Sequence, residues 1–167
     1  MILGTGIDVV HIPALADQLR VPGSPWLDRV LTARELRHVR ARLAASATAD
    51  EDVNALALHV GARWAAKEAV VKAWSAALRG YPPPISEEEL DYREIEVVHD
   101  HWGRPSIELH GRVARAVTDS LTTHATPLGP AAPDPDAPAQ TPVTWHVSLS
   151  HDGDTAMAMV ILEGPTA

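Results

Sequence analysis

The sequence predicts an α+β protein in which antiparallel hairpins accompany one long helix. The helix is expected over residues 51–78, because this run has no proline and a single glycine. One hairpin is expected where residues 95–98 and 106–110 flank a Trp-Gly-Arg-Pro turn. A second is expected where residues 144–151 and 155–163 flank an Asp-Gly-Asp turn. These elements define the predicted class.

Length and composition restrict the class of protein. At 167 residues the chain fits one domain with a real core, and we predict a single domain over residues 1–167. It has no cysteine, which excludes disulfides, thiolate metal sites and a cysteine nucleophile. It has neither a basic-plus-apolar leader nor a long apolar run, so we expect a cytoplasmic protein that spans no membrane. The net charge of −8 argues against nucleic-acid binding through bulk electrostatics, so an anionic ligand must find a local basic patch.

The chain opens with a predicted strand over residues 2–12, which is rich in Val, Ile and Leu. Gly4 and Gly6 precede Asp8 within it and indicate close approach by another chain or a ligand. The pattern lacks the third glycine and the following helix of a dinucleotide-binding site, so that kind of site is excluded. An acid in an apolar strand is costly unless it binds a cation or hydrogen-bond donors. Asp8 is therefore either a cation ligand or a satisfied carboxylate at the strand end.

Two shorter helices are expected before the long one. Residues 13–20 begin with a proline suited to a first turn, and residues 32–43 begin with Thr32 as N-cap and Glu35 as its capping-box partner. A connector of small residues follows at 44–50. The densest basic group of the chain lies around the second helix: Arg29, Arg34, Arg37, Arg40 and Arg42. This group is either a docking surface for an acidic partner or a solvated face.

The long helix carries an unusual pair of charged residues. Its apolar stripe consists of Val53, Leu56, Val60, Trp64, Val71 and Leu78. Lys67 falls inside this stripe and Glu68 on its edge. A buried charge costs several kcal/mol unless it is paired, so the two residues indicate a function. The simpler interpretation is a surface ion pair between Glu68 and Lys72, which contributes a few tenths of a kcal/mol.

The remaining chain contains another predicted helix, over residues 111–121, and a stretch at 125–142 that is rich in Pro and Ala. We expect the stretch to be a surface insertion without a core of its own. In the final hairpin, Ser148 and Ser150 should share one face of their strand. The opposite face should carry Trp145, Val147, Leu149 and His151.

Four short motifs occur in order along the chain. They are Gly-x-Gly-Ile-Asp at 4–8, Arg-Trp-Ala-Ala-Lys-Glu-Ala at 63–69, Gly-Arg-Pro at 103–105 and Ser-Leu-Ser-His-Asp at 148–152. In their order and spacing they resemble those of the 4′-phosphopantetheinyl transferases, specifically the short holo-acyl-carrier-protein synthase type. The resemblance runs from Met1 to Glu163, interrupted mainly by the connector and the insertion. Residues 72–83 are most similar to members that serve type I fatty acid synthases.

The resemblance implies a fold, an activity and an assembly. The expected fold is that of the family, a small antiparallel sheet packed on the long helix. The expected reaction is Mg²⁺-dependent transfer of 4′-phosphopantetheine from coenzyme A to a serine of an apo-acyl carrier protein or a carrier domain of a fatty acid synthase. Adenosine 3′,5′-bisphosphate is the expected second product. The family forms trimers with active sites between subunits, so a homotrimer is expected.

The resemblance also implies roles for individual residues. Asp8 and Glu68 are expected to bind Mg²⁺, which prefers one or two carboxylates together with waters and phosphate oxygens. Lys72 completes the expected catalytic set, and either Glu68 through a water or Lys72 itself accepts the serine proton. The expected contacts of coenzyme A are Arg63, Lys67, Lys72, Ser150 and His151, with Arg104 as a further candidate.

Two positions depart from the family pattern. Ala14 stands where many relatives carry a basic residue that docks the acidic carrier protein, so the arginine group becomes the expected docking surface. His11 stands where many relatives have Glu, which leaves metal binding to Asp8, Glu68 and water. The alternative class is a non-catalytic trimeric module that binds coenzyme A or a carrier protein, and a Mg²⁺-dependent pyrophosphate hydrolase is a poorer option. The presence of Asp8, Glu68 and Lys72 argues against the module.

Overall fold

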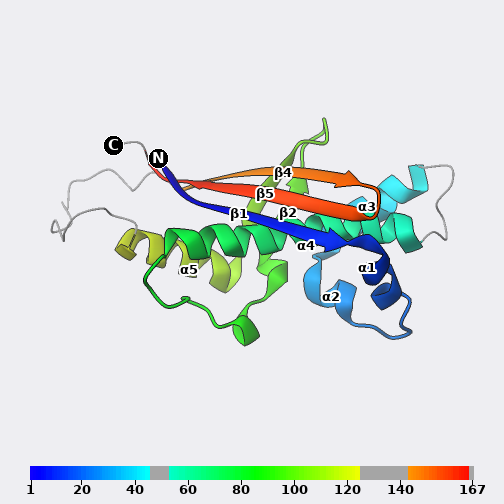
Figure 1. The fold of residues 1–167 in the computed structure, drawn as a ribbon, viewed down its shortest axis with the longest axis horizontal. Helices are drawn as coiled ribbons and strands as arrows, with labels where there is room; N and C mark the ends of the chain where they lie inside the picture. The colour runs from blue at the N-terminus through cyan, green and yellow to red at the C-terminus, as the bar shows by residue number, and fades with distance from the viewer. Residues whose placement is uncertain (46–52, 125–142, 166–167) are drawn as a thin grey trace.

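The computed structural model describes residues 1–45, 53–124 and 143–165. The predicted insertion at 125–142 and most of the predicted connector lie outside these residues. The elements in chain order are β1 (Ile2–His11), α1 (Ile12–Leu19), α2 (Trp26–Val30), α3 (Ala33–Ala45), α4 (Val53–Ala77), the 3₁₀ turns η1 (Glu87–Glu89) and η2 (Tyr92–Glu94), β2 (Ile95–His99), β3 (Pro105–Leu109), α5 (Gly111–His124), β4 (Thr144–Asp152) and β5 (Thr155–Glu163) (Figure 1). Each predicted helix and strand is present within a few residues of its expected bounds, while α2 and the two 3₁₀ turns were not predicted.

The strands form two antiparallel units. One sheet has the order β1-β5-β4, and β2 pairs with β3 in a separate hairpin. The three-stranded sheet lies along α4, which runs beneath it (Figure 1). In its register, Asp8 of β1 lies opposite Ala158 of β5, and Ala158 lies opposite Leu149 of β4. The predicted arrangement of a small antiparallel sheet on a long helix is therefore confirmed.

The glycines of β1 allow this strand to lie directly on α4. A Cβ atom built on Gly4 would lie 2.1 Å from the carbonyl oxygen of Ala73, and one built on Gly6 would lie 2.0 Å from that of Ala69. Such distances are far inside van der Waals contact, so any side chain at these positions would push the strand away. The close approach that the sequence indicated is therefore made by this chain's own helix.

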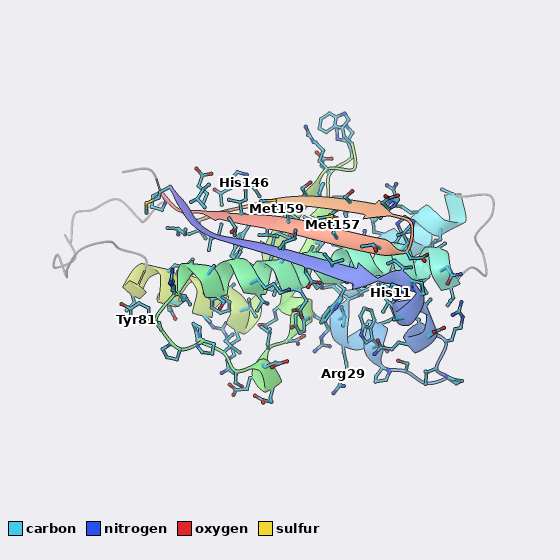
Figure 2. The ribbon with its side chains drawn as sticks, in the orientation of Figure 1. His11, Arg29, Tyr81, His146, Met157 and Met159 are labelled. Carbon is cyan, nitrogen blue, oxygen red and sulfur yellow. The ribbon has the colours of Figure 1, made fainter. Side chains whose placement is uncertain are left out.

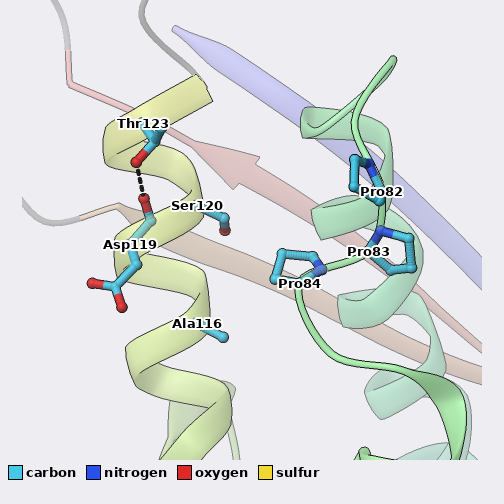
Figure 3. A pocket seen from close by; sticks show the side chains of 7 residues that line it. All are labelled: Pro82, Pro83, Pro84, Ala116, Asp119, Ser120 and Thr123. Atoms are coloured by element: carbon cyan, nitrogen blue, oxygen red, sulfur yellow. Dashed lines mark hydrogen bonds between the residues drawn. The ribbon is translucent and has the colours of Figure 1, made fainter.

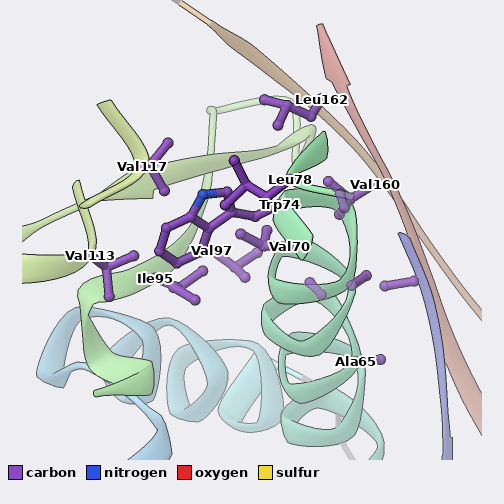
Figure 4. Packing of buried hydrophobic residues seen from close by; sticks show 14 of the residues in the cluster. Ala65, Val70, Trp74, Leu78, Ile95, Val97, Val113, Val117, Val160 and Leu162 are labelled. Atoms are coloured by element: carbon purple, nitrogen blue, oxygen red, sulfur yellow. The ribbon is translucent and has the colours of Figure 1, made fainter. Parts of the chain in front are cut away.

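Helix α4 is buried on more than one side. Figure 4 shows Val70 and Trp74 packing against Ile95 and Val97 of β2 and against Val113 and Val117 of α5. The Trp74 indole N–H donates a hydrogen bond of 3.0 Å to the Ser120 hydroxyl of α5. Small residues such as Ala69 and Ala73 are fully buried on the side that faces β1. The single apolar stripe predicted from periodicity was incomplete, because the sheet covers one side of α4 while β2 and α5 cover another.

The sheet has an inner face toward α4 and an outer face that remains open. Ile7, Val9 and Met159 are more than 40% exposed on this outer face. Met157 and Met159 of β5 are labelled in Figure 2. Ser148 and Ser150 share the exposed side of β4, as the alternation predicted, and lie opposite Met159 and Met157 in the register.

Candidate active site

Asp8 and Lys72 meet where β1 crosses α4. The alternation of β1 turns Asp8 toward the helix, and the Asp8 side chain is only 15% exposed. The Lys72 ammonium donates to Asp8 Oδ1 at 2.8 Å and to the Ile7 carbonyl at 3.2 Å. The hydrogen bond to Asp8 raises the pKa of Lys72 most. Burial opposes this effect, and the charges of Asp8 and Glu68 raise the pKa further. Lys72 is thus held as a cation by Asp8 and lies within electrostatic reach of Glu68.

Glu68 lies beside this pair and is bound by a residue that the sequence did not indicate. The Tyr92 hydroxyl donates to Glu68 Oε1. Burial raises the pKa of Tyr92 most, followed by the hydrogen bond to Glu68 and the charges of Glu68, Glu87 and Asp8. The negative charges of both Asp8 and Glu68 therefore act on the phenol. Tyr92 lies outside every recognised motif, so no sequence signal connected it with Glu68.

The simpler interpretation of Glu68 and Lys72 as a surface ion pair is wrong. Lys72 pairs with Asp8, which is 64 positions away in the chain, and Glu68 pairs with Tyr92. The two residues remain within electrostatic reach of each other, because the charge of Glu68 contributes to the raised pKa of Lys72. The structure thus brings Asp8, Glu68 and Lys72 together, as the motifs implied.

Lys67 does not take the predicted place among the phosphate contacts. Its side chain is fully buried, and its ammonium donates to Glu35 Oε2 at 2.8 Å, to the Val30 carbonyl at 2.7 Å and to the Tyr92 carbonyl at 2.9 Å. An ammonium has three N–H donors, and all three are occupied within the protein. We therefore correct the assignment of Lys67 as a coenzyme A contact, because reaching a ligand would require breaking a buried ion pair.

Glu35 is the partner that a buried Lys67 requires. Its carboxylate also accepts from the Thr32 N–H at 2.8 Å, while the Thr32 hydroxyl accepts from the Glu35 N–H at 3.1 Å. This reciprocal pair is the predicted capping box of α3. Glu35 Oε1 accepts from the Val97 N–H at 2.9 Å, so one carboxylate joins α3, α4 and β2. The capping-box signal predicted the local bonds of Glu35 but not its long-range ones.

Arg63 lies in a second group of cationic side chains. It is 3% exposed and donates to the His59 carbonyl at 2.9 Å, while its Nε has no partner within the described residues. Burial lowers the pKa of His59, and the charges of Arg63, Arg42, His151 and His38 lower it further. Arg63 and His151, both predicted contacts of coenzyme A, therefore share one electropositive environment.

Two histidines extend this electropositive environment between α3 and β2. The rings of His38 and His99 stack with centroids 4.7 Å apart and planes inclined by 19°. His38 Nε2 is buried and has no partner in the described part of the chain. Burial, together with the charges of Arg63, His38 and Arg42, lowers the pKa of His99 to about 4.

Ser150 and Arg104 lie apart from Asp8 within one chain. Ser150 is exposed on the outer face of the sheet, whereas Asp8 points to the inner face. Arg104 lies in the β2–β3 turn, where it pairs with Asp100 at 2.5 Å and covers the Trp102 ring at 4.5 Å. That turn projects beyond the body of the sheet in Figure 1. The structure of a single chain does not bring these two predicted residues to the carboxylates.

Asp8 and Glu68 fit a divalent cation by their chemistry. Each carboxylate accepts a hydrogen bond at one oxygen, Asp8 from Lys72 and Glu68 from Tyr92, and keeps a second oxygen without a partner among the described residues. Two carboxylate oxygens on facing elements match the preference of Mg²⁺ for hard oxygen ligands. A second acidic group, formed by Glu96, Glu108 and His110, differs because the Arg34 guanidinium lies 3.6 Å from Glu96 and 3.1 Å from Glu108. We interpret that group as an ion-pair network.

A pocket elsewhere on the molecule is not part of this site. It has a volume of about 390 Å³ and lies between α5 and the loop that follows α4 (Figure 3). It is lined by Pro82, Pro83, Pro84, Ala116, Asp119, Ser120 and Thr123. No residue of the predicted site lines it.

Among the described residues, no helix combines the length and apolar character needed to cross a bilayer.

Comparison with known proteins gives consistent results across sequence and structure. Residues 4–129 match the family model of the 4′-phosphopantetheinyl transferase superfamily. The holo-[acyl-carrier-protein] synthase of Mycobacterium tuberculosis (strain ATCC 25618 / H37Rv) is 39% identical over 164 residues, which cover 98% of each chain. That of Corynebacterium glutamicum is 38% identical over 160 residues, which cover 96% of this chain and 97% of the relative.

Solved structures agree with these relatives. A complex of ACPS with CoA from Chronobacterium ammoniagenes matches with a TM-score of 0.75 and 36% identity, covering 97% of each chain. The acyl carrier protein synthase of Mycobacterium tuberculosis matches with a TM-score of 0.63 and 36% identity, covering 99% of this chain and all of the other. Sequence and fold similarity therefore extend over nearly the whole chain.

Proposed function

This chain belongs to the 4′-phosphopantetheinyl transferase superfamily, and from that premise we propose that it is a holo-[acyl-carrier-protein] synthase. It transfers 4′-phosphopantetheine from coenzyme A to a serine of an apo-acyl carrier protein and releases adenosine 3′,5′-bisphosphate. The observation that carries this proposal is the meeting of Asp8, Glu68 and Lys72, from β1 and α4, at one position in the fold.

The reaction places particular demands on these residues. A serine hydroxyl attacks the phosphorus that carries pantetheine, and the adenosine bisphosphate leaves from the opposite side. Catalysis of this kind depends on positioning and on neutralising charge on the phosphate oxygens. Mg²⁺ held by Asp8 and Glu68 would supply part of that neutralisation. Because the Lys72 ammonium donates to Asp8, we assign Lys72 to the remaining neutralisation and the serine proton to Glu68 acting through a water.

The electropositive environment around Arg63 supports a role in binding the nucleotide half of coenzyme A. Coenzyme A carries several phosphate groups, and the chain as a whole has a net charge of −8. Arg63 and His151 supply positive or protonatable groups within this environment, and the unpartnered Nε of Arg63 is a buried donor that an anion would satisfy. We assign both residues to the phosphates and nucleotide of coenzyme A.

The open outer face of the sheet supports a homotrimer. Ile7, Val9 and Met159 are exposed there in one chain, and Met157 and Ile161 continue the same side of β5. Burying these side chains against neighbouring copies removes apolar surface from water. Assembly also offers Ser150 and Arg104 a route to a neighbour's carboxylates, from which they are separated in their own chain. A fully active monomer in sedimentation at micromolar concentration would exclude this assembly.

One experiment tests the reaction itself. The protein is incubated with coenzyme A, Mg²⁺ and apo-carrier protein, and the carrier is weighed by mass spectrometry. The wild type should add one phosphopantetheine group to the carrier. Asp8→Ala or Glu68→Gln should abolish this gain in mass, although each variant should remain folded and show a cooperative unfolding transition. Asp17→Asn removes an exposed carboxylate on α1 and serves as the matched control. Binding of coenzyme A without any gain in carrier mass would instead identify a non-catalytic module.

Four further features stay predictions from the sequence. They are a preference for Mg²⁺, service to a type I fatty acid synthase, a cytoplasmic location and a single domain over residues 1–167. Metal substitution in the mass assay tests the first, and comparison of a free carrier protein with a carrier domain of a fatty acid synthase tests the second.

A further inference from the structure

Tyr92 contacts Glu68 although it belongs to none of the recognised motifs. It lies in η2, between the acidic turn η1 and strand β2, and its hydroxyl donates to Glu68 Oε1. The bond joins residues 24 positions apart, so it exists only because η2 packs beside α4. A hydroxyl bound to one oxygen of a carboxylate fixes the orientation of the other.

Tyr92 is itself held at its main chain and at its ring. Its carbonyl oxygen accepts a hydrogen bond of 2.9 Å from the buried Lys67 ammonium, which Glu35 neutralises. Its ring packs on Trp64 with centroids 4.6 Å apart, and the Trp64 ring forms a T-shaped pair with Trp26, with centroids 5.7 Å apart. Main chain, ring and hydroxyl are therefore all fixed, which leaves the phenol little freedom to turn away from Glu68. This connection gives Lys67 a structural reason to stand next to Glu68 in the sequence.

The bond from Tyr92 also keeps Glu68 from a competing partner. Glu68 and Lys72 are four residues apart on α4, a spacing at which a carboxylate and an ammonium pair readily. The charge of Glu68 raises the pKa of Lys72, yet the Lys72 ammonium donates to Asp8 and to the Ile7 carbonyl. With Oε1 occupied by Tyr92, the second oxygen of Glu68 stays available.

We propose that Tyr92 is a positioning residue that fixes Glu68 through Oε1 and thereby presents Oε2 to a divalent cation. This inference rests on the proposed function, in which Asp8 and Glu68 bind the cation. Without the Tyr92 hydroxyl, Glu68 is free to turn toward Lys72, and the pair of carboxylates must be reassembled each time a cation binds. Loss of the hydroxyl should therefore weaken cation binding more than it slows transfer at saturating cation.

The test measures binding of Mn²⁺ to the full chain by the electron paramagnetic resonance signal of the free ion, without coenzyme A or carrier. Tyr92→Phe removes only the hydroxyl and keeps the ring on Trp64. Its Kd for Mn²⁺ should rise about tenfold, as expected for loss of a residue that orients a metal ligand. Tyr81→Phe, at the chain's other tyrosine, should stay within about twofold of the wild type. In transfer assays, the KM for Mg²⁺ should rise for Tyr92→Phe while kcat at saturating Mg²⁺ stays within about threefold.

The outcomes separate this inference from the proposed function. An unchanged Kd for Mn²⁺ in Tyr92→Phe, with transfer intact in the wild type, overturns the positioning role alone. Absence of transfer in the wild type overturns the proposed function whatever Tyr92 does. If Tyr92→Phe unfolds, Tyr92→His replaces it, because histidine keeps a ring and an N–H donor. A Kd for Mn²⁺ of Tyr92→His that equals the Kd of a folded Tyr92→Ala variant would also refute the inference.

Discussion

Removing either member of the buried Lys67–Glu35 pair should be strongly destabilising. The perturbations are Lys67→Met and Glu35→Gln, each of which keeps the approximate side-chain volume and deletes one charge. Both side chains have no exposed surface, so the charge that remains has no access to water. An unpaired charge in that position is the costliest common defect of a protein interior.

The contacts set the magnitude of the effect. Lys67→Met leaves the Glu35 carboxylate with the Thr32 and Val97 N–H groups but without its ion-pair partner, and it removes one hydrogen bond from each of the Val30 and Tyr92 carbonyls. Breaking a buried ion pair from one side typically costs about 3–5 kcal/mol. A domain of ordinary stability, about 5–15 kcal/mol, would lose a large fraction of its margin. The double variant should lose less than the sum of the two, by about 1–3 kcal/mol, because no charge is left unpaired.

Urea unfolding followed by tryptophan fluorescence measures these free energies. Arg112→Ala, which breaks the exposed pair with Glu89, is the control and should lower stability far less than Lys67→Met. If Lys67→Met lowers stability by less than about 1 kcal/mol and instead abolishes coenzyme A binding, the structural role is refuted. Lys67 would then be the phosphate contact that the sequence predicted.

Three further predictions concern the backbone at Gly6, the half-buried His99 and the exposed arginines of α3. Gly6→Ala should lower stability by about 3 kcal/mol or more, because the new Cβ would meet the Ala69 carbonyl at 2.0 Å, as unfolding in urea will measure. The pKa of His99 is lowered to about 4, so unfolded chains bind a proton between pH 6.5 and 4 that folded chains do not. The free energy of unfolding should therefore decrease as the pH is lowered from 6.5 to 4. In His99→Asn this decrease in the free energy of unfolding should be smaller, by at most about 3 kcal/mol, as unfolding experiments at several pH values will measure. Reversing Arg37 and Arg40 to Glu should raise the KM for carrier protein and flatten its dependence on salt, because both side chains are exposed on α3.

Each of these predictions has a matched control. Thr5→Ala changes an outward side chain of β1 and should leave stability within about 0.5 kcal/mol. His101→Asn changes an exposed histidine in the β2–β3 turn and serves as the control for loss of a histidine side chain. Reversal of Arg79 and Arg115, which are exposed on other surfaces, makes the same change in net charge. If that control raises the KM for carrier protein equally, the arginine group of α3 is a solvated face.

Much of the fold followed from local patterns in the sequence. Period-two alternation and the Asp-Gly turn predicted the β4–β5 hairpin, and the same alternation predicted that Ser148 and Ser150 share an exposed side. The reciprocal bonds of Thr32 and Glu35 were predicted because a capping box joins residues only three apart. These features depend on neighbours in the chain, which the sequence lists directly.

The assignments that failed depend on packing between distant elements. Periodicity put Lys67 on the apolar side of α4 but gave no means of choosing between a ligand and a buried acid as its partner. In the structure the partner is Glu35, because α3 and η2 pack against the Lys67 ammonium and bury it. The single apolar stripe was incomplete for a similar reason, since a helix covered from two sides needs apolar or small residues around most of its circumference.

The sequence by itself determined the chemical components of the site and the strand and helix that carry them. Asp8 and Glu68 were chosen because an acid in an apolar strand and a charge beside an apolar stripe are costly without a ligand or partner. The tertiary structure decided which partners these groups have: Asp8 with Lys72, Glu68 with Tyr92, and Lys67 with Glu35. The physical reason is that the cost of burying a charge is a property of the residue, whereas its compensation depends on whichever element the fold brings within hydrogen-bonding distance.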